Sequence, residues 1–336
     1  MGYKSSIEKR FIRYKGYVLR IGNLDLPGNL VLSPMAGVTD APFRYIARKC
    51  GAHYTISEMI SAKQELWDTN KTQLRVNDNW QTFPKIIQIA GASPEVVSEA
   101  AIKCEQFGAD IVEINMGCPA KKVCNVLSGS ALLKDEALVY SILSEVSKKI
   151  SIPVTLKTRL GWDHDYYNID KIALMAQDCG IKSLTIHGRT RSDLYNGEAS
   201  YDLIAKVKQN ATIPIFANGD ITSVDKAISV LDLTKADGLY IGRGALGRPW
   251  IFNQINHYIK SKELLPDPSI NEIKAIMLEH LDCIYQHYGD EMGCKMARKH
   301  VKWYLQNLDG LDNKQLIAEF NLIKSAKLQL EFIQKI

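Results

Sequence analysis

Eight short apolar runs, separated by segments with a helical pattern, constrain the fold of this chain more than any other feature. Several runs are continuously aliphatic or β-branched, as expected for parallel strands that are buried on both faces. Proline stands at or near the start of three runs, where a missing N–H does least damage. The eight runs are Leu30–Pro34, Tyr54–Ser57, Lys85–Ile89, Asp110–Ile114, Val154–Lys157, Ser183–Ile186, Ile213–Ala217 and Gly238–Ile241.

The segments between these runs have the pattern of amphipathic helices. In Pro94–Phe107 apolar side chains recur at helical spacing, and Ser93 stands where an N-cap residue would. Tyr201–Lys208 and Asp225–Leu231 behave similarly. Strand and helix alternate eight times, which predicts an α/β fold of the (β/α)₈ TIM-barrel type. A doubly wound sheet fits that count less well.

Strand signals stop after about Ile251. The segments Asn271–His287, Gly293–Leu305 and Lys314–Ile336 read as helices and follow a proline-containing stretch at 265–268. We therefore predict a basic N-terminal arm over residues 1–20, a catalytic barrel over 21–255 and a small all-α helical domain over 256–336.

Composition excludes several classes of protein. Hydrophobic residues make up 46% and charged residues 24% of the 336 residues, as in soluble globular proteins. The sequence contains no run of 18 apolar residues, so it predicts no membrane span. Seven scattered cysteines without a Cys-x-x-Cys pair argue against a disulfide framework, a zinc site or an iron–sulfur cluster. A metal-free protein of the reducing cytoplasm fits this pattern.

The net charge of +5 is mild, but basic residues gather in the N-terminal arm. The arm has one acidic residue, Glu8, and six basic residues: Lys4, Lys9, Arg10, Arg13, Lys15 and Arg20. A solvated tail and a contact with nucleic-acid phosphates both remain open.

Distinctive residues follow nearly every predicted strand. Because barrel active sites lie at the C-terminal ends of the strands, we expect these residues to meet at one mouth. They are Pro34-Met35-Ala36-Gly37-Val38-Thr39-Asp40, Gln88, Asn115-Met116-Gly117-Cys118-Pro119, Lys157-Thr158-Arg159, His187-Gly188-Arg189-Thr190-Arg191, Asn218-Gly219-Asp220 and Gly242-Arg243-Gly244.

Glycines at the last two strand ends favour a phosphate site. Gly242, Gly244 and Gly247 spell G-x-G-x-x-G, but no βαβ unit follows them, so we reject a dinucleotide-binding fold. Backbone N–H groups at Gly219 and Gly242, with the guanidinium of Arg243, suit a phosphate monoester such as that of FMN. Tight barrel turns without a ligand are the alternative.

Three side chains at the predicted mouth can take part in chemistry. Cys118 follows a buried strand, and an ordinary thiol is protonated at neutral pH, so it can act as a general acid. Cys124 lies in the same loop, and sequence alone does not separate the two. Lys157 can stabilise a reduced flavin, form a Schiff base or make a salt bridge with Glu113 or Asp163. His187 can donate a hydrogen bond to a flavin or substrate, or be purely structural.

Four basic residues of the helical domain fall on one helix face. Lys295, Arg298, Lys299 and Lys302 are spaced at i, i+3, i+4 and i+7, just before two aromatic residues. A stripe that tracks nucleic-acid phosphates and a plain solvated face are both consistent with this spacing.

Taken together, these blocks resemble the signature of tRNA-dihydrouridine synthases, in particular the bacterial B subclass. The resemblance runs from about Ile21 to Leu308. It rests on Ile114-Asn115-Met116-Gly117-Cys118-Pro119-Ala120-Lys121-Lys122-Val123, Gly129-Ser130-Ala131-Leu132-Leu133, the strand-end runs above, and Ala297-Arg298-Lys299-His300 with Trp303-Tyr304.

The resemblance implies a flavin barrel that reduces a uridine of the tRNA D-loop to 5,6-dihydrouridine. NADPH or NADH would reduce FMN, hydride would pass to C6 of uracil, and Cys118 would protonate C5. The substrate would be bound by Asn115 and Arg159, and tRNA by Lys295, Arg298, Lys299 and Lys302. FMN would contact Pro34, Met35, Ala36, Gln88, Lys157, His187, Asn218, Gly219, Asp220, Gly242 and Arg243. A monomer suffices, and the reacting base must be turned out of the folded tRNA.

Two departures from the family pattern concern the substrate contacts. Cys124-Asn125-Val126 stands where relatives often carry basic residues, and Asp193 stands where a glutamine is common. Three rival functions remain open: a flavin barrel acting on a small molecule, a lyase that uses Lys157, and a tRNA-binding protein without catalysis.

Overall fold

The structure is a computed structural model. It describes residues 19–76, 78, 80, 83–124, 128–308 and 312–336, without the side chains of 121 and 122. The predicted basic arm therefore lies outside the described residues, except for Leu19 and Arg20. So do Asn125 and Val126 of the loop that departs from the family pattern.

A curled parallel sheet of nine strands forms the centre of the molecule, in the order β4-β3-β11-β10-β9-β8-β7-β6-β5. A parallel bridge between Ile56 and Ile86 joins the two ends of this sheet, so the predicted (β/α)₈ barrel is confirmed. The strands are β3 (Leu30–Leu32), β4 (Tyr54–Thr55), β5 (Ile60–Ser61), β6 (Ile86–Ala90), β7 (Ile111–Met116), β8 (Val154–Arg159), β9 (Leu184–His187), β10 (Ile215–Asn218) and β11 (Gly238–Ile241).

Every predicted run overlaps an observed strand, but the second barrel position is divided in two. β4 pairs with β3, whereas the additional strand β5 pairs with β6. The chain between them leaves the sheet, and the bridge at Ile56 with the hydrogen bond from Ser57 to Ile86 spans the gap.

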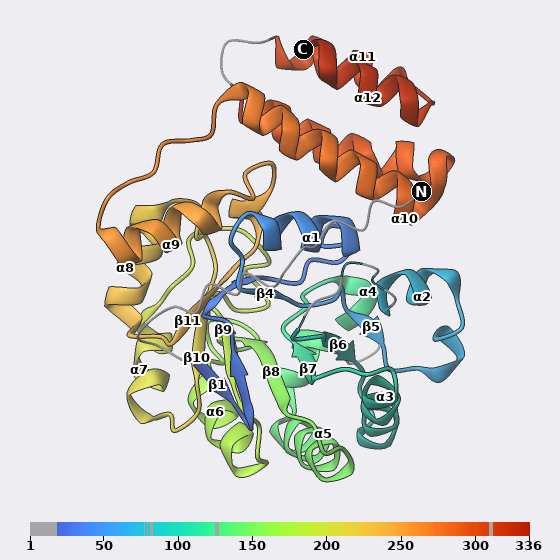
Figure 1. The fold of residues 1–336 in the computed structure, drawn as a ribbon. Coiled ribbons are helices and arrows are strands. Elements are labelled where there is room, and N and C mark those ends of the chain that lie inside the picture. The colour runs from blue at the N-terminus through green and yellow to red at the C-terminus, as the bar shows by residue number, and fades with distance from the viewer. Residues whose placement is uncertain (1–18, 77, 79, 81–82, 125–127, 309–311) are drawn as a thin grey trace.

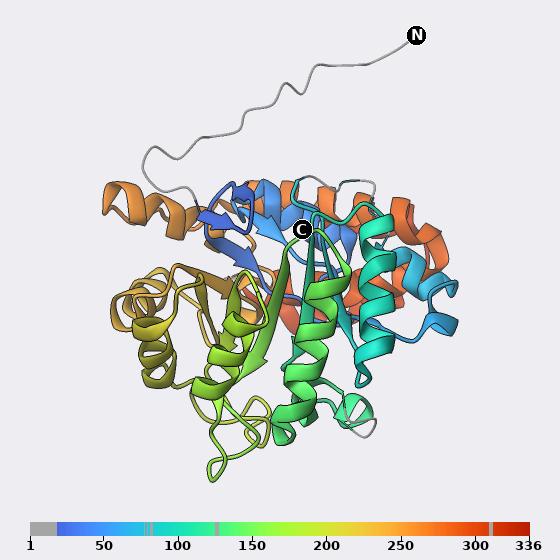
Figure 2. The ribbon, with the colours of Figure 1, turned by 90° about the horizontal axis from the view of Figure 1, so that it is seen from below.

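Helices cover the flanks of the barrel, with the orange and red C-terminal helices along another side (Figure 2). Their starts follow from local capping: Ser93, Asp135 and Ser223 accept hydrogen bonds from backbone N–H groups of α3, α5 and α8. The helices are α1 (Ala41–Lys49), α2 (Asn70–Val76), α3 (Pro94–Gln106), α4 (Lys121–Cys124), α5 (Glu136–Lys149), α6 (Ile169–Asp178), α7 (Asp202–Asn210), α8 (Val224–Thr234) and α9 (Ile251–Ser261).

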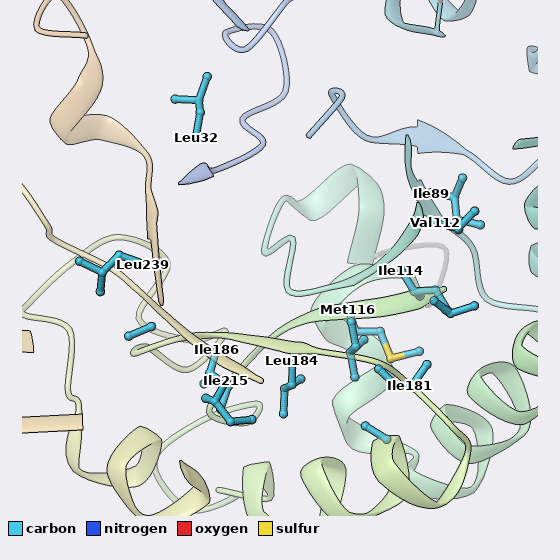
Figure 3. Packing of buried hydrophobic residues seen from close by; sticks show 14 of the residues in the cluster. Leu32, Ile89, Val112, Ile114, Met116, Ile181, Leu184, Ile186, Ile215 and Leu239 are labelled. Carbon is cyan, nitrogen blue, oxygen red and sulfur yellow. The ribbon is translucent and has the colours of Figure 1, made fainter. Parts of the chain in front are cut away.

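Alternation along the strands separates the core from the site. Outward residues such as Val112 and Ile114 of β7, or Leu184 and Ile186 of β9, join the helices in one apolar core. Figure 3 shows these side chains pointing from the sheet towards the surrounding helices. The alternate positions point into the barrel, because successive strand side chains face opposite sides. That interior therefore receives the polar side chains of β6 to β11.

An N-terminal hairpin that the sequence reading missed closes one end of the barrel. Strands β1 (Leu19–Ile21) and β2 (Leu24–Leu26) pair antiparallel. Their apolar side chains share a buried cluster with inward residues of the barrel, including Phe216 and Tyr240. Three-residue strands give too short a pattern to be recognised without this packing.

The C-terminal helices form a layer outside the barrel, with α1 between (Figure 1). The two helices predicted over Asn271–His287 and Gly293–Leu305 are confirmed. They share the label α10 (Ile270–Gln306), but the backbone at Gly289 is not helical, with φ of +71°, and separates them, and the rings of His280 and His300 lie against each other across this turn. The predicted last helix is instead two, α11 (Asn313–Leu322) and α12 (Ala326–Lys335).

The layer has its own apolar cluster, distinct from the barrel core. The predicted domain boundary at 255/256 falls within α9, whose buried residues pack on the barrel, and it stays a prediction. Among the described residues, no helix is both long and apolar enough to cross a membrane.

Candidate active site

A cavity of about 420 Å³ opens at the C-terminal ends of β3 and β8 to β11. Its volume lies in the range typical of small-molecule and cofactor sites. Nine of the eleven predicted cofactor residues line it: Pro34, Met35, Lys157, His187, Asn218, Gly219, Asp220, Gly242 and Arg243. Ala36 is exposed beside Met35, and Gln88 is buried inside the barrel, so neither lines the cavity.

Lys157 presents a buried ammonium to this cavity. Its Nζ donates a hydrogen bond of 3.0 Å to Oδ1 of Asn218, whose own Nδ2 donates to the backbone oxygen of Tyr240. Burial lowers the pKa of Lys157 to about 8, while the nearby Glu113 opposes that shift. The salt bridge to Glu113 or Asp163 that was one alternative does not occur among the described residues.

A carboxylate at the end of β10 holds two arginines. Asp220 accepts two hydrogen bonds from buried Arg189, at 2.9 and 2.6 Å, and one of 3.0 Å from Arg243. Burial opposes ionisation, but the bonds from Arg189 and the backbone of Ala199 keep the pKa of Asp220 below its usual value. The ionised carboxylate thus fixes the guanidinium of Arg243 at the cavity wall.

Glycines at the cavity are required by close backbone approaches. A Cβ on Gly219, where φ is +125°, would lie 2.7 Å from the Cβ of Ala199 and 3.0 Å from the ring of His187. A Cβ on Gly244 would lie 2.1 Å from the backbone oxygen of Ile221. Side chains at these positions would push the turns apart, which supports the predicted role of glycine in shaping this wall.

His187 is a neutral imidazole at the cavity. Burial, followed by the positive charges of Arg159 and Lys157, lowers its pKa well below the usual value. It can therefore donate one hydrogen bond and accept another. Tyr195, which the sequence reading missed, lies exposed at the rim, 5.2 Å from the guanidinium of Arg243. An exposed aromatic ring in a loop gives no periodic signal by which to find it.

A hydrogen-bonded network inside the barrel links the predicted residues Gln88 and Asn115. Gln88 donates to Glu113 at 2.6 Å and accepts from Nδ2 of Asn115 at 3.0 Å. Tyr240 donates to the second carboxylate oxygen of Glu113 at 3.0 Å. Burial raises the pKa of Glu113. Glu113 and Tyr240, at the centre of this network, are 127 positions apart in the sequence, which is why the sequence did not reveal the network.

The network continues to the loop that carries Cys118. Oδ1 of Asn115 accepts hydrogen bonds from the backbone N–H groups of Gly117 and Cys118, at 3.1 and 2.9 Å. The backbone oxygen of Cys118 accepts from both the N–H and the hydroxyl of Ser130. A Cβ on Gly129 would lie 2.7 Å from that same oxygen. The Gly129-Ser130 pair therefore fixes the cysteine's backbone.

The structure separates the two candidate cysteines. The side chain of Cys124 is buried and its Sγ lies 3.5 Å from the backbone oxygen of Cys118. Cys118 itself is half-exposed. Burial raises the pKa of the Cys118 thiol, although its backbone bond and the nearby Arg159 oppose the shift. Of the two residues, Cys118 is the more exposed.

Arg159 lies beneath this loop and contacts backbone. Its Nε donates to the oxygen of Gly117 at 2.8 Å, and its Nη1 donates to the oxygens of Thr190 and Leu194. Arg159 thus ties the Cys118 loop to the loop after β9. In that second loop Asp193 accepts from the backbone and hydroxyl of Thr190.

The four basic residues of α10 do not share one environment. Lys295 and Lys302 are exposed, and Lys295 pairs with Glu291 one turn away. Arg298 is half-buried. Lys299 points towards the barrel, and its Nζ donates to the backbone oxygen of Gly37 at 2.5 Å. The predicted stripe is therefore split between the surface and the joint with the barrel.

The joint between α10 and the barrel contains a buried cluster of Asp40, His280 and His300. One carboxylate oxygen of Asp40 and one ring nitrogen of each histidine lie within 4.8 Å of one another. Asp40 caps α1 by accepting from the N–H of Phe43 and also accepts from Tyr288. These bonds give its carboxylate oxygens a structural role between α1 and α10.

Comparisons with solved structures agree with the barrel. A 2-naphthoyl-CoA reductase complex matches with a TM-score of 0.56 at 12% identity, over 71% of this chain and 51% of that one. A 6-hydroxypseudooxynicotine amine oxidase from Pseudomonas geniculata matches with a TM-score of 0.56 at 14% identity, over 72% of this chain and 49% of that one. The chain thus spans about half of each of these proteins, and the likeness concerns the fold alone.

Sequence relatives cover nearly the whole chain. Proteins named tRNA-dihydrouridine synthase B share 48% identity in Pseudomonas aeruginosa, over 95% of both chains, and 50% in Pseudomonas putida, over 93% of this chain and 92% of that one. The Escherichia coli protein of that name shares 48% over 94% of this chain and 98% of its own. A family model described as dihydrouridine synthase matches residues 31–336. As its motifs predicted, the chain belongs to the dihydrouridine synthase family.

Proposed function

We propose that this protein is an oxidoreductase that reduces a uridine in the D-loop of tRNA to 5,6-dihydrouridine. The observation that carries the proposal is the joint arrangement of two features at one barrel mouth. The cavity with Lys157 and Arg243 lies at the strand ends, and the Cys118 loop follows β7 at the same end of the barrel. Family membership supports this reading over a lyase that uses Lys157.

The cavity fits FMN. Gly219 and Gly244 allow its turns to pack closely against Ala199 and the backbone of Ile221, and Asp220 orients Arg243 towards a phosphate. The ammonium of Lys157 has Asn218 as its single side-chain hydrogen-bond partner in the described part of the chain, so it can face a negatively charged ring. When bound, FMN would supply the hydride for C6 of uracil after reduction by NADPH or NADH.

Cys118 supplies the proton in this proposal. Its raised pKa keeps the thiol protonated at neutral pH, which suits a general acid that acts on C5 of uracil. Asn115 and Ser130 hold its backbone, and Arg159 holds the backbone oxygen of the preceding Gly117. A thiol fixed in this way loses little entropy when it meets the substrate.

The exposed basic residues of α10 support a tRNA contact. Lys295 and Lys302 are exposed and can approach phosphates, whereas Arg298 is half-buried on the same helix, and such contacts would make binding depend on salt. A uridine inside folded tRNA must be turned outward to reach the cavity. A single chain holds all of these groups, so a monomer suffices.

The decisive experiment measures dihydrouridine at each position of tRNA from cells that lack this protein. The purified enzyme with FMN and NADPH should restore it at one site. Cys118→Ala should not restore it, although its flavin should still be reduced by NADPH. Cys179→Ala, a thiol far from the mouth, is the matched control and should act like the wild type. Unchanged dihydrouridine at every site, with no activity on unmodified tRNA, would refute the proposed substrate.

A further inference from the structure

The helical layer touches the loop that follows β3, which forms one wall of the cavity. The contact is made by Lys299 of α10, whose ammonium donates to the backbone oxygen of Gly37 at 2.5 Å. Pro34 and Met35, a few residues earlier, line the cavity. Lys299 thus reaches across 262 positions of sequence to the wall of the cavity.

The same residue is also held through its N–H group. The backbone N–H of Gly37 donates to the carboxylate of Glu58, which also pairs with Arg75 at 3.3 Å. Gly37 has a φ of +76°, so the loop turns sharply at this point. Lys299 and Glu58 therefore clamp the apex of the loop through its carbonyl and its N–H.

Within the loop, Met35 is tied to this apex. The N–H of Met35 donates to the hydroxyl of Thr39 at 2.9 Å, and the backbone oxygen of Met35 accepts from the N–H groups of Val38 and Thr39. Movement of the apex is therefore transmitted to Met35. The sulfur of Met35 in turn lies within 3.4 Å of where a Cβ on Gly242 would be.

The end of the loop is also attached to α10. Asp40 accepts a hydrogen bond of 3.2 Å from the hydroxyl of Tyr288, and its Oδ2 lies 3.8 Å from Nε2 of His300. The carboxylates of Asp40 and Glu58 lie near enough to Lys299 to attract its positive charge, and both belong to this contact between α10 and the barrel. An ammonium that is half-buried between them is less available to phosphates than an exposed one.

We propose that Lys299 is a positioning residue for the flavin cavity and not a contact to tRNA phosphates. By holding the Gly37 carbonyl it fixes the wall formed by Pro34 and Met35, so cofactor affinity depends on the helical layer. This inference rests on the proposed function, because it assumes that the cavity binds FMN and that α10 binds tRNA.

The test compares Lys299→Met with Lys302→Met, the same substitution at an exposed residue of the same helix. Two quantities are measured for each: the Kd of FMN, from flavin fluorescence, and the dependence of tRNA affinity on KCl concentration. Lys299→Met should raise the Kd of FMN about tenfold or more and leave the salt slope unchanged. Lys302→Met should reduce the salt slope by about one, as for one lost phosphate contact, and leave the Kd of FMN unchanged.

Lys299→Arg keeps a charged donor and should restore FMN affinity to within a few-fold of the wild type. This rescue also decides the case if Lys299→Met fails to fold. An unchanged Kd of FMN in Lys299→Met, or a weakened Kd that Lys299→Arg does not restore, overturns the inference. A reduced salt slope in Lys299→Met overturns it as well. Failure of the wild type to bind FMN or tRNA would instead refute the proposed function on which it rests.

Discussion

Replacing Lys157 by methionine should change how the stability of the flavin-free protein depends on pH. Burial lowers the pKa of Lys157 from its usual 10.5 to about 8. Each pKa unit corresponds to about 1.4 kcal/mol, so the charged form costs about 3 kcal/mol more in the folded than in the unfolded chain. Below pH 8 this cost is present in full. Between about pH 8 and 10.5 the unfolded chain holds more protons, so wild-type stability rises with pH.

Methionine has a similar volume and carries no charge, so Lys157→Met lacks this contribution. It leaves Oδ1 of Asn218 without its donor, which costs about 1–3 kcal/mol at every pH and does not alter the slope. The predicted signature is therefore a difference in unfolding free energy between wild type and variant that shifts by about 2.5 kcal/mol in favour of the wild type from pH 7 to 10.

Denaturant unfolding at several pH values, on protein stripped of flavin, measures this difference. Lys206→Met is the matched control, because Lys206 is exposed and pairs only at the surface with Asp170. It should follow the wild-type pH dependence throughout. Parallel curves for Lys157→Met and wild type between pH 7 and 10 would show that the ammonium is not destabilised by burial, and the reasoning would fail.

Three further outcomes are expected. Arg189→Met should lower stability by about 3 kcal/mol in chemical denaturation, because it removes both bonds from the buried guanidinium to Asp220 and leaves the backbone oxygens of Asn196 and Gly197 without their donor. A loss under about 1 kcal/mol would contradict a structural role of Arg189. Gly244→Ala should purify with much less flavin than Gly242→Ala. The added Cβ of Gly244→Ala would lie 2.1 Å from the backbone oxygen of Ile221, whereas that of Gly242→Ala would lie 3.4 Å from the sulfur of Met35. Equal flavin content in the two variants would argue against a rigid turn. The rate at which tRNA oxidises the reduced flavin, measured in single turnovers, should fall only as pH rises through the raised pKa of Cys118. A fall in this rate centred below about pH 8.5, the ordinary value of a thiol, would exclude Cys118 as the acid.

Patterns of short range were enough to predict the barrel. Strands buried on both faces need continuous apolar runs, and these runs are readable one at a time. Because all barrel strands are parallel, residues that follow them in sequence must meet at one end of the barrel. For that reason the sequence already placed Lys157, Asn218 and Arg243 together, and the cavity contains all three.

The directions of individual side chains depended on packing between distant segments. Lys299 has the helical spacing of a surface stripe, yet α10 lies against α1 and turns that ammonium to Gly37. Arg159 was expected to face the substrate, but three backbone oxygens from two other loops accept its N–H groups. Spacing specifies a helix face and not what lies opposite it.

The sequence by itself thus determined the eight barrel runs, most of the helices between them, and the end of the barrel at which the reactive groups gather. Only the tertiary structure decided that Cys118 is more exposed than Cys124, and that Glu113 and Tyr240 share a buried network. The physical reason is range. Backbone preferences and apolar periodicity act within a few residues, whereas hydrogen bonds and burial depend on which distant atoms the folded chain brings within about 3 Å.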